Sequence, residues 1–315
     1  MSSGNLPTLS VAICTCDQQA FIGEAIESVL AQNYPRLEVV VADDSSSDAT
    51  SQIVADYAKR YPQVIRAVLH RGERSIVANF NRALAACSGE LVAILDGDDV
   101  YLPGKLGAQV EAFVREPDVV LCRHPVEVFD DQTGATLRIA DPNPGQKRAQ
   151  AIDLVAKGNF VPTASNMMRR AAMPSAGVPI AFRHAPDWIL AIETARNGTI
   201  LRVPQVLARY RVHPAQITNV VPGRDEVFRD VMRTLSYVEE RYPELAAAVP
   251  QGRRVLSLWE ASRRFTGTRD LGWINAGLRT ALRHDPLNPR LWLILFAANA
   301  HVRWLTRLLR RRLTR

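Results

Sequence analysis

Short apolar runs alternate with segments of helical period through residues 1–125, and this alternation constrains the fold more than any other feature. Apolar runs rich in β-branched residues predict buried strands. Segments whose apolar residues recur three or four positions apart predict helices that cover a sheet. This order is typical of an α/β fold with a mostly parallel sheet. The predicted strands are residues 9–14, 37–42, 65–69, 91–95 and 119–122, and the predicted helices are residues 22–30, 49–61, 76–86 and 105–115.

The pattern changes near residue 220, where amphipathic helices replace the alternation. Before that point, residues 130–145 are polar and contain Gly and Pro, which favours a variable surface loop. The Pro222-Gly223 pair is the expected boundary, so we predict an α/β domain over residues 1–221 and an α-helical C-terminal region over residues 222–315. The helices expected in that region are residues 227–241, 254–265 and 273–283.

The chain has 39 basic and 32 acidic residues, a net charge of +7, and the whole excess lies near the C-terminus. Residues 286–315 contain seven arginines and no acid, which leaves 32 basic and 32 acidic residues in residues 1–285. A nucleic-acid-binding protein normally spreads its basic excess over a recognition face, because neutralised phosphates drive its affinity. The distribution of charge therefore argues against a nucleic-acid partner.

Residues 290–315 form a predicted basic amphipathic tail. Within residues 302–313 the apolar side chains share one side of a helix and most arginines share the other, and Trp292 and Trp304 add aromatic rings. Such a helix can lie in the surface of an anionic membrane. The alternative is a helix that packs on the α/β domain or on a second subunit, which leaves a homodimer open.

The cysteines and the termini favour a cytoplasmic protein. The four cysteines form no C-x-x-C pair and are too sparse for a disulfide framework, so a reducing compartment fits best. The N-terminal residues lack the basic and apolar segments of a signal peptide. The longest apolar run, residues 291–298, is shorter than the roughly 20 residues of a spanning helix. We therefore expect no membrane span, and at most peripheral binding at the inner face of the cell membrane.

Three polar clusters follow predicted strands, at residues 14–17, 43–48 and 96–99. In an open parallel sheet the ends of neighbouring strands meet at one edge, where ligands bind. Up to six carboxylates would then face one cleft, and a hard divalent cation would offset their repulsion. The alternatives are helix capping, which accounts for Asp48, and a turn in which Gly97 supplies a positive φ. Neither G-x-G-x-x-G nor G-x-x-x-x-G-K-[ST] is present, which argues against a dehydrogenase or a P-loop ATPase.

Three segments carry a longer pattern, in the order SVAICTCD, EAIESVLAQNYPRLEVVVADDSSSDAT and ANFNRALAACSGELVAILDGDD. Together they resemble the family 2 glycosyltransferases of the GT-A fold, over residues 9–215. The resemblance implies a Rossmann-like sheet, with nucleotide-sugar binding in residues 1–125 and acceptor binding in residues 126–221. It also implies transfer of a sugar, with inversion, from a UDP- or dTDP-sugar to an acceptor hydroxyl. Mg²⁺ or Mn²⁺ would assist, and the acceptor would be a saccharide or lipid-linked saccharide in bacterial cell-surface polysaccharide or glycolipid synthesis.

On the donor side, the resemblance assigns roles to five residues. Cys14, Thr15 and Asp44 match positions that contact the nucleotide base. Asn79 and Asn81 match polar helix positions that line the donor cleft. The alternative for Asn79 is an ordinary solvated helix residue.

On the diphosphate and acceptor side, the resemblance assigns four more. Asp96 and Asp98 match the D-x-D motif, with Asp96 at the ribose and Asp98 at the metal. Asp187 matches the catalytic base, and His213 matches a histidine that approaches the metal or the diphosphate. Without the resemblance, Asp187 would be interpreted as the N-cap of a helix that begins at the next residue, and His213 as an ordinary hydrogen-bonded histidine.

Two other classes of protein are alternatives to a glycosyltransferase. A nucleotidyltransferase acting on a sugar phosphate would require an early Gly-rich, basic triphosphate loop, which the sequence lacks. A catalytically silent nucleotide-binding scaffold would not require all four motif aspartates, Asp44, Asp96, Asp98 and Asp187. Four arginines could neutralise phosphates, but in so arginine-rich a chain each is interpreted as surface charge: Arg71, Arg74, Arg209 and Arg211.

Overall fold

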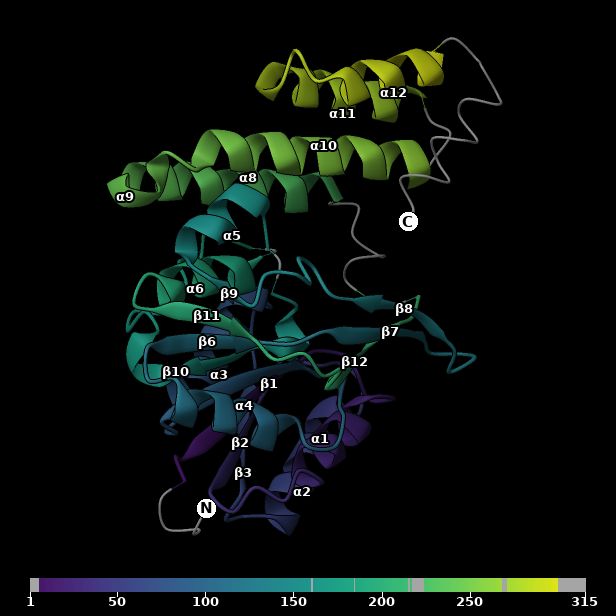
Figure 1. The fold of residues 1–315 in the computed structure, drawn as a ribbon. Coiled ribbons are helices and arrows are strands. Elements are labelled where there is room, and N and C mark those ends of the chain that lie inside the picture. The colour runs from purple at the N-terminus through teal and green to yellow at the C-terminus, as the bar shows by residue number, and fades with distance from the viewer. Residues whose placement is uncertain are drawn as a thin grey trace. The chain divides into compact units, whose positions relative to one another are not determined.

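The structure is a computed structural model that describes residues 6–159, 161–183, 185–214, 216, 224–267 and 271–299. The chain divides into two compact units, which are coloured along the sequence in Figure 1. We call them the α/β unit (Met1–Ala151 and Asn159–Asp230) and the helical unit (Ile152–Gly158 and Val231–Arg315).

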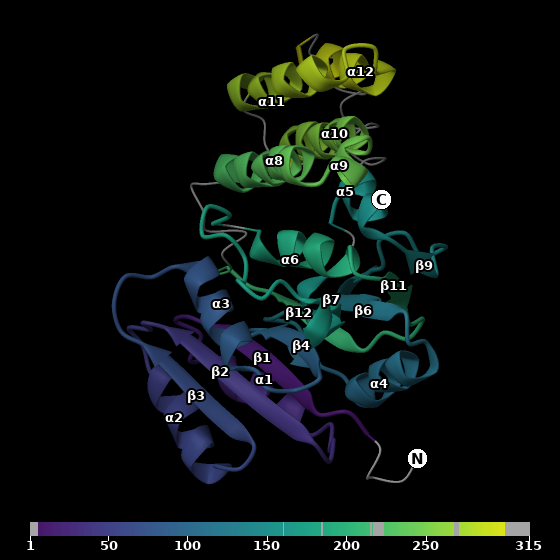
Figure 2. The same ribbon diagram turned by 90° about the vertical axis from the view of Figure 1, so that its left-hand side faces the viewer.

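An eight-stranded sheet forms the centre of the α/β unit (Figure 2). In spatial order its strands are β3 (Ile65–His70), β2 (Leu37–Asp44), β1 (Leu9–Thr15), β4 (Leu91–Asp96), β10 (Met167–Arg169), β6 (Val119–Arg123), β11 (Thr199–Arg202) and β9 (Arg148–Ala149). The first four pair in parallel, and β10 runs antiparallel between β4 and β6. The five predicted strands and the α/β class are confirmed.

Helices cover both faces of this sheet. They are α1 (Ile22–Leu30), α2 (Thr50–Arg60), α3 (Ile76–Ala86), α4 (Lys105–Arg115) and α6 (Pro186–Ala195). Successive residues of a strand point to opposite faces. Val11 and Ile13 of β1 therefore join a core with α1 and α4, whereas Ala12 joins a second core with Ala83 of α3. Figure 2 shows α1 and α3 on opposite sides of the sheet. The four helices predicted in residues 1–125 are confirmed.

A smaller sheet lies beside the end of β4. Its strands, in spatial order, are β5 (Val100–Tyr101), β12 (Ala208–Val212), β7 (Val126–Asp130) and β8 (Thr136–Ala140). The expectation of a loop over residues 130–145 is therefore wrong in part, because β7 and β8 form an antiparallel pair. β8 lacks the signal of a buried strand, since Leu137 and Ile139 are about half exposed. The pairing of β12 with β5 brings the last strand of the unit to the acidic turn after β4.

The helical unit confirms the three helices expected after residue 220 and adds others. Its helices, in whole or in part, are α5 (Ala151–Lys157), α8 (Arg224–Arg241), α9 (Pro243–Ala246), α10 (Val249–Gly267), α11 (Leu271–His284) and α12 (Pro289–Asn299). The division between the units crosses α5 and α8, because Ala151 and residues 224–230 belong to the α/β unit. Gly252 lets α10 approach α5, because a Cβ there would lie 2.1 Å from the Val155 carbonyl oxygen. None of the described helices is long and apolar enough to span a membrane.

The predicted domain limits fall partly on residues that are not described. The division at residue 221 lies within residues 217–223, and residues 300–315 of the predicted tail are also outside the described residues. Residues 152–158, expected in the acceptor-binding part, belong to the helical unit. The assignment of nucleotide-sugar binding to residues 1–125 and of acceptor binding to residues 126–221 stays a prediction.

Candidate active site

The carboxyl ends of β1, β2 and β4 meet at one edge of the sheet. The parallel registers place Cys14 opposite Asp96 and Thr15 opposite Asp43. Asn79 of α3 is buried against this edge, where its side-chain amide donates to the carbonyl oxygen of Ala42 at 2.9 Å. Its interpretation as a solvated helix residue is therefore wrong, because the side chain holds α3 against the end of β2.

The aspartates after β2 have separate tasks. Asp44 is buried, and its two carboxylate oxygens accept hydrogen bonds from the Arg82 guanidinium at 2.6 Å and from the backbone N–H of Ser75 at 2.7 Å. Asp43 is fully buried and accepts from the Ser51 hydroxyl at 2.6 Å. Asp48 precedes the N-cap Ala49, and it accepts a hydrogen bond from the backbone N–H of Thr50 in the first turn of α2, as expected. Of the three, Asp44 is held by a cation.

The loop after β1 packs tightly against the turn after β4. The Thr15 hydroxyl donates to the side-chain oxygen of Gln18 at 2.8 Å. A Cβ on Gly97 would lie 2.8 Å from Thr15 and 2.5 Å from that Gln18 oxygen, so the turn requires a residue without a side chain. Gly97 does not have a positive φ, so the turn alternative gave the wrong reason for this glycine. Burial raises the pKa of the Cys14 thiol, which keeps it protonated rather than nucleophilic.

The turn at residues 96–99 concentrates negative charge. Burial, followed by the neighbouring carboxylates of Asp98 and Asp187, raises the pKa of Asp96 to about 8. Asp99 is almost completely buried, and burial followed by the carboxylates of Asp98 and Asp96 raises its pKa well above the usual range. One Asp98 oxygen lies 3.0 Å from Nε2 of His213. The structure therefore brings the two D-x-D aspartates, the candidate base and the C-terminal histidine to one place.

Arg211 of β12 holds this turn, and its interpretation as surface charge is wrong. Its Nε donates to the Asp98 carbonyl oxygen at 2.8 Å, and its backbone N–H donates to the Asp99 carboxylate at 3.0 Å. The guanidinium also pairs with Asp131 and Glu24. Its side chain is only 7% exposed. The alternation of β12 was the available signal, because Arg211 lies two residues before His213 and shares its side of the strand.

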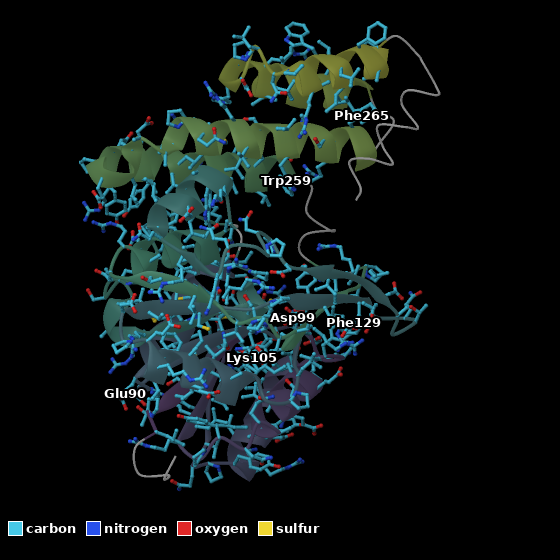
Figure 3. The ribbon with its side chains drawn as sticks, in the orientation of Figure 1. Glu90, Asp99, Lys105, Phe129, Trp259 and Phe265 are labelled. Carbon is cyan, nitrogen blue, oxygen red and sulfur yellow. The ribbon has the colours of Figure 1, made fainter. Side chains whose placement is uncertain are left out.

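Aromatic rings complete the surroundings of these two residues. The guanidinium carbon of Arg211 lies 4.9 Å from the ring centre of Phe21 and 4.8 Å from that of Phe129. The Phe21 ring also lies 4.6 Å from the imidazole of His213, centre to centre. Figure 3 labels Phe129 and Asp99 near the centre of the α/β unit. The rings restrict the movement of the Arg211 and His213 side chains and limit access of water to them.

Asp98 and His213 are the described residues best suited to hold a divalent cation. Carboxylate oxygens are the ligands that Mg²⁺ and Mn²⁺ prefer, and a neutral imidazole can add a nitrogen. Within the described part of the chain, no three His, Cys, Asp or Glu side chains form a complete cage for a metal. That agrees with the usual Mg²⁺ site, in which one or two carboxylates act together with water and substrate phosphates.

Asp187 lies in the first turn of α6. The helix begins at Pro186 with Ala185 as its N-cap, so the interpretation of Asp187 as an N-cap is wrong. Its carboxylate accepts a hydrogen bond from the Asn159 side chain at 2.7 Å and a longer one from the Thr163 hydroxyl at 3.4 Å. Burial raises the pKa of Asp187 from its ordinary value. Sequence reasoning did not identify Asn159 or Thr163, because they lie more than 20 residues before Asp187.

Asn81 lies apart from these groups. Its side-chain amide donates to the carbonyl oxygen of Val178 at 2.7 Å and accepts from the backbone N–H of the same residue at 2.8 Å. Gly177 next to it has a φ of +71°, and a Cβ there would lie 2.7 Å from the Asn81 oxygen. Asn81 therefore ties α3 to the segment before α6, with both of its polar groups engaged.

Curated relatives match more than half of this chain in sequence. An uncharacterized protein of Mycobacterium tuberculosis, Rv1520, is 34% identical over 212 residues, which are 65% of this chain and 59% of the relative. The putative glycosyltransferase EpsE of Bacillus subtilis is 29% identical over 174 residues, 55% of this chain and 59% of the relative. The match thus spans about three fifths of the length of these relatives.

Solved structures share the fold. TarS of Staphylococcus aureus, residues 1–349 in complex with UDP, gives a TM-score of 0.62 at 20% identity and covers 96% of this chain and 90% of that one. The mannosyltransferase PcManGT of Pyrobaculum calidifontis, in complex with GDP-Man and Mn²⁺, gives a TM-score of 0.61 at 18% identity and covers 99% of this chain and 86% of that one. The GT-A expectation is confirmed.

A family profile described as Glycosyl transferase family 2 matches residues 10–174, more than half of the chain. The chain belongs to glycosyltransferase family 2.

Proposed function

We propose that this chain is an inverting, metal-dependent glycosyltransferase that moves a sugar from a nucleoside-diphosphate sugar to an acceptor hydroxyl. The observation that carries the proposal is the acidic site at the end of β4, where Asp98 meets His213 and Asp187 lies close enough to raise the pKa of Asp96. A site of this kind combines a place for the charged leaving group with a carboxylate that can accept a proton.

The donor nucleotide is proposed to bind at the ends of β1 and β2. Cys14, Thr15 and Asp44 would contact the base, and Asp96 the ribose. Asp44 keeps lone pairs for a base N–H, because each carboxylate oxygen can accept about two hydrogen bonds. Asn79 would act by fixing the ends of the strands, since its amide already bonds to Ala42. We propose a uridine or thymidine diphosphate donor. The complexes of TarS with UDP and UDP-GlcNAc support a uridine nucleotide, whereas the GDP-Man complex of PcManGT supports a guanosine one.

Asp98 and His213 would hold Mg²⁺ or Mn²⁺. When bound, the cation stabilises the negative charge of the departing nucleoside diphosphate as a Lewis acid. Arg211 keeps Asp98 in position by binding its carbonyl oxygen, and it balances part of the surrounding negative charge. The residues present therefore fit the cation that the family implies.

Asp187 is proposed as the catalytic base. Asn159 and Thr163 both bind its Oδ2 and so fix the orientation of the carboxylate that would meet the acceptor. As the acceptor oxygen bonds to the anomeric carbon, its proton passes to Asp187 and the bond to the diphosphate oxygen breaks. A single displacement from the face opposite the leaving group inverts the anomeric centre. The raised pKa of Asp187 makes it a better proton acceptor.

The acceptor is proposed to be a saccharide or lipid-linked saccharide of bacterial cell-surface polysaccharide or glycolipid synthesis. One relative, the GalNAc(5)-diNAcBac-PP-undecaprenol β-1,3-glucosyltransferase of Campylobacter jejuni, is 33% identical over 106 residues, 34% of each chain. Its name describes a lipid-linked acceptor, which supports this class. We further propose that the enzyme works in the cytoplasm at the inner face of the membrane, held by residues 290–315.

The test is a panel of nucleotide sugars incubated with Mn²⁺ and acceptor extracts, with release of nucleoside diphosphate as the measurement. The expected result is metal-dependent release that increases with one acceptor fraction and is lost in Asp98→Ala and Asp187→Ala. Asp56→Ala is the matched control, because that carboxylate is exposed on α2 and pairs with Lys59. Absence of metal-dependent turnover, or full turnover in Asp98→Ala, would contradict the mechanism. A silent scaffold would bind the nucleotide without turnover.

A further inference from the structure

Helix α12 is apolar on all sides. One side packs into a core with α11 and α10, where Leu291 and Ile294 are almost completely buried. The opposite side carries Trp292, Leu293 and Phe296, which are 52%, 41% and 58% exposed. Figure 3 shows ring side chains that project from α11 and α12 on the side turned away from α10. A helix that is hydrophobic all round is usually covered on all sides, so a partner is expected on this face.

Hydrogen bonds fix the side chains on the exposed face of α12, and a groove runs beside them. The indole N–H of Trp292 donates to the Pro286 carbonyl oxygen at 2.7 Å, which fixes the ring at the start of the helix. A reciprocal pair of amide hydrogen bonds, both 2.9 Å, joins Asn275 of α11 to Asn299 of α12. Between the two helices lies a groove of about 670 Å³, lined by Asn275, Arg279, Trp292, Leu295, Phe296 and Asn299. The face therefore offers aromatic rings and a shallow apolar groove.

Unpaired arginines surround this face. Arg279, Arg283 and Arg290 are exposed, and none of them forms an ion pair within the described residues. The one acid in residues 271–299 is Asp285, which accepts a hydrogen bond from Asn288 at 2.8 Å. Elsewhere in the helical unit the pattern differs, because Arg253 pairs with Glu239. We call Arg279, Arg283 and Arg290 the arginine rim of the α12 face. These arginines of α11 and α12 lack acidic partners of the kind that Arg253 of α10 has.

We propose that the exposed face of α12 binds an anionic lipid surface, with Trp292 and Phe296 at the boundary between head groups and acyl chains. The charge pattern selects this occupant. A second copy would bring the same arginines against each other, and residues 300–315, with six arginines and no acid, carry the same sign. A negatively charged bilayer accepts both the apolar face and the arginine rim. This surface deepens the proposed membrane localisation, on which it rests, and it does not depend on the proposed sugar transfer.

The test is co-sedimentation of the full chain with lipid vesicles, without nucleotide sugar. Vesicles of phosphatidylcholine alone are compared with vesicles that contain phosphatidylglycerol. We expect wild-type protein to bind the anionic vesicles and to dissociate as salt is raised. The double variant Trp292→Ser, Phe296→Ser should bind at least about tenfold more weakly. The triple variant Arg279→Gln, Arg283→Gln, Arg290→Gln should lose roughly fivefold per arginine on anionic vesicles.

Trp259→Ser is the matched control, because Trp259 is 57% exposed on α10 of the same unit but lies outside the α12 face. It should bind vesicles like wild type, and thermal unfolding should show that all variants are folded. Wild-type binding by the Trp292 and Phe296 variant would overturn the proposal, because the arginine-rich C-terminal residues would then suffice. A concentration-dependent dimer that the same variant abolishes would also overturn it, in favour of a second copy. Turnover of a soluble acceptor should be unchanged in every variant, so failure here is distinct from failure of the proposed function.

Discussion

Asp44 and Asp96 end two strands that flank β1, yet their electrostatic surroundings are opposite. Asp44 has a cation of its own, because Arg82 binds one oxygen and the Ser75 N–H binds the other. Asp96 faces carboxylates: Asp98 and Asp187 are the charged groups that raise its pKa. One carboxylate is balanced by the fold, and the other lies in a site that an external cation would balance.

The difference separates two kinds of aspartate among the motif residues of this site. A carboxylate with a built-in partner can orient a neutral ligand group such as a nucleotide base, because its charge is already offset. A cluster without such a partner suits a ligand that brings positive charge. The following substitutions test whether the two ends of the edge are divided in this way.

The largest effect is expected at the unbalanced end. Asp98→Asn should lower kcat/KM by about 10³-fold and weaken Mn²⁺ binding, because it replaces the carboxylate beside His213 with a neutral amide. Asp44→Asn should leave Mn²⁺ affinity unchanged, since that carboxylate is paired with Arg82. Free Mn²⁺ can be followed by electron paramagnetic resonance, with turnover measured in parallel. Equal loss of Mn²⁺ binding in both variants would remove the distinction.

A smaller effect is expected from Arg211→Gln. The variant loses the bond to the Asp98 carbonyl oxygen and the pairs with Asp131 and Glu24, so Asp98 should be less well positioned. Residues that orient a metal ligand typically contribute about 10- to 100-fold in affinity or activity. We expect a loss of that size in Mn²⁺ affinity and in kcat together.

Arg202→Gln is the control for Arg211. Arg202 lies on β11 and pairs with Asp141, so its loss removes a partly buried ion pair elsewhere in the same unit. It should lower the melting temperature without changing Mn²⁺ affinity. If both variants lose stability and neither loses Mn²⁺ affinity, Arg211 has a structural role only.

Arg82→Met removes the cation that pairs with Asp44, and it should weaken binding of the nucleotide sugar without affecting the transfer step. Asp44 would keep its bond to Ser75 but lose its cation, which should raise the KM for the nucleotide sugar about tenfold with little change in kcat. Arg66→Met is the control, because that side chain bonds only a carbonyl oxygen at the end of α3. An unchanged KM together with a reduced kcat would place Arg82 with the chemistry rather than with the base.

The fold was largely predictable, because its main strands and helices are long and buried on one or both sides. Residues 37–42 and 91–95 are continuous apolar runs, and the structure has strands there. The shorter strands were not predicted. β10 has three residues and β9 has two, and each is ordered by neighbours from distant parts of the chain. A segment of two or three residues is too short to show the hydrophobic periodicity of a strand.

The site was predictable where a motif lies on consecutive residues and not where long-range contacts build it. Asp96 and Asp98 were found in one turn. Arg211 was missed because its spacing of two residues from His213 was the one local signal, and its contact with the Asp98 carbonyl oxygen joins distant parts of the chain. Gly97 was found for the wrong reason, since the constraint is the approach of Thr15 from another strand. Asn159 was missed for the same cause.

Lys105 extends the comparison to a buried cation and should show the smallest effect. Its side chain is fully buried at the start of α4, where its ammonium donates to the Gln109 oxygen at 2.7 Å and lies 4.0 Å from the ring centre of Tyr101. Burial lowers the pKa of Lys105 to about 7. Figure 3 labels it in the interior of the α/β unit. A buried charge that has no ionic partner gives up its charge, as Asp96 does in the opposite sense.

The sign of the pH dependence follows from proton counting. Between pH 7 and 10.5 the unfolded chain binds a proton at Lys105 that the folded chain does not, so raising the pH favours the folded state. The stability from this group is present above pH 10.5 and is lost as the pH falls through about 7. Relative to Lys105→Met, wild-type protein should gain about 1 kcal/mol in free energy of unfolding between pH 7 and 8. Urea unfolding at each pH measures this difference, with Lys59→Met on exposed α2 as the control that should show none. A difference that stays constant with pH would mean that Lys105 keeps its charge inside the protein. A buried cation without an ionic partner would then not lose its charge as Asp96 does.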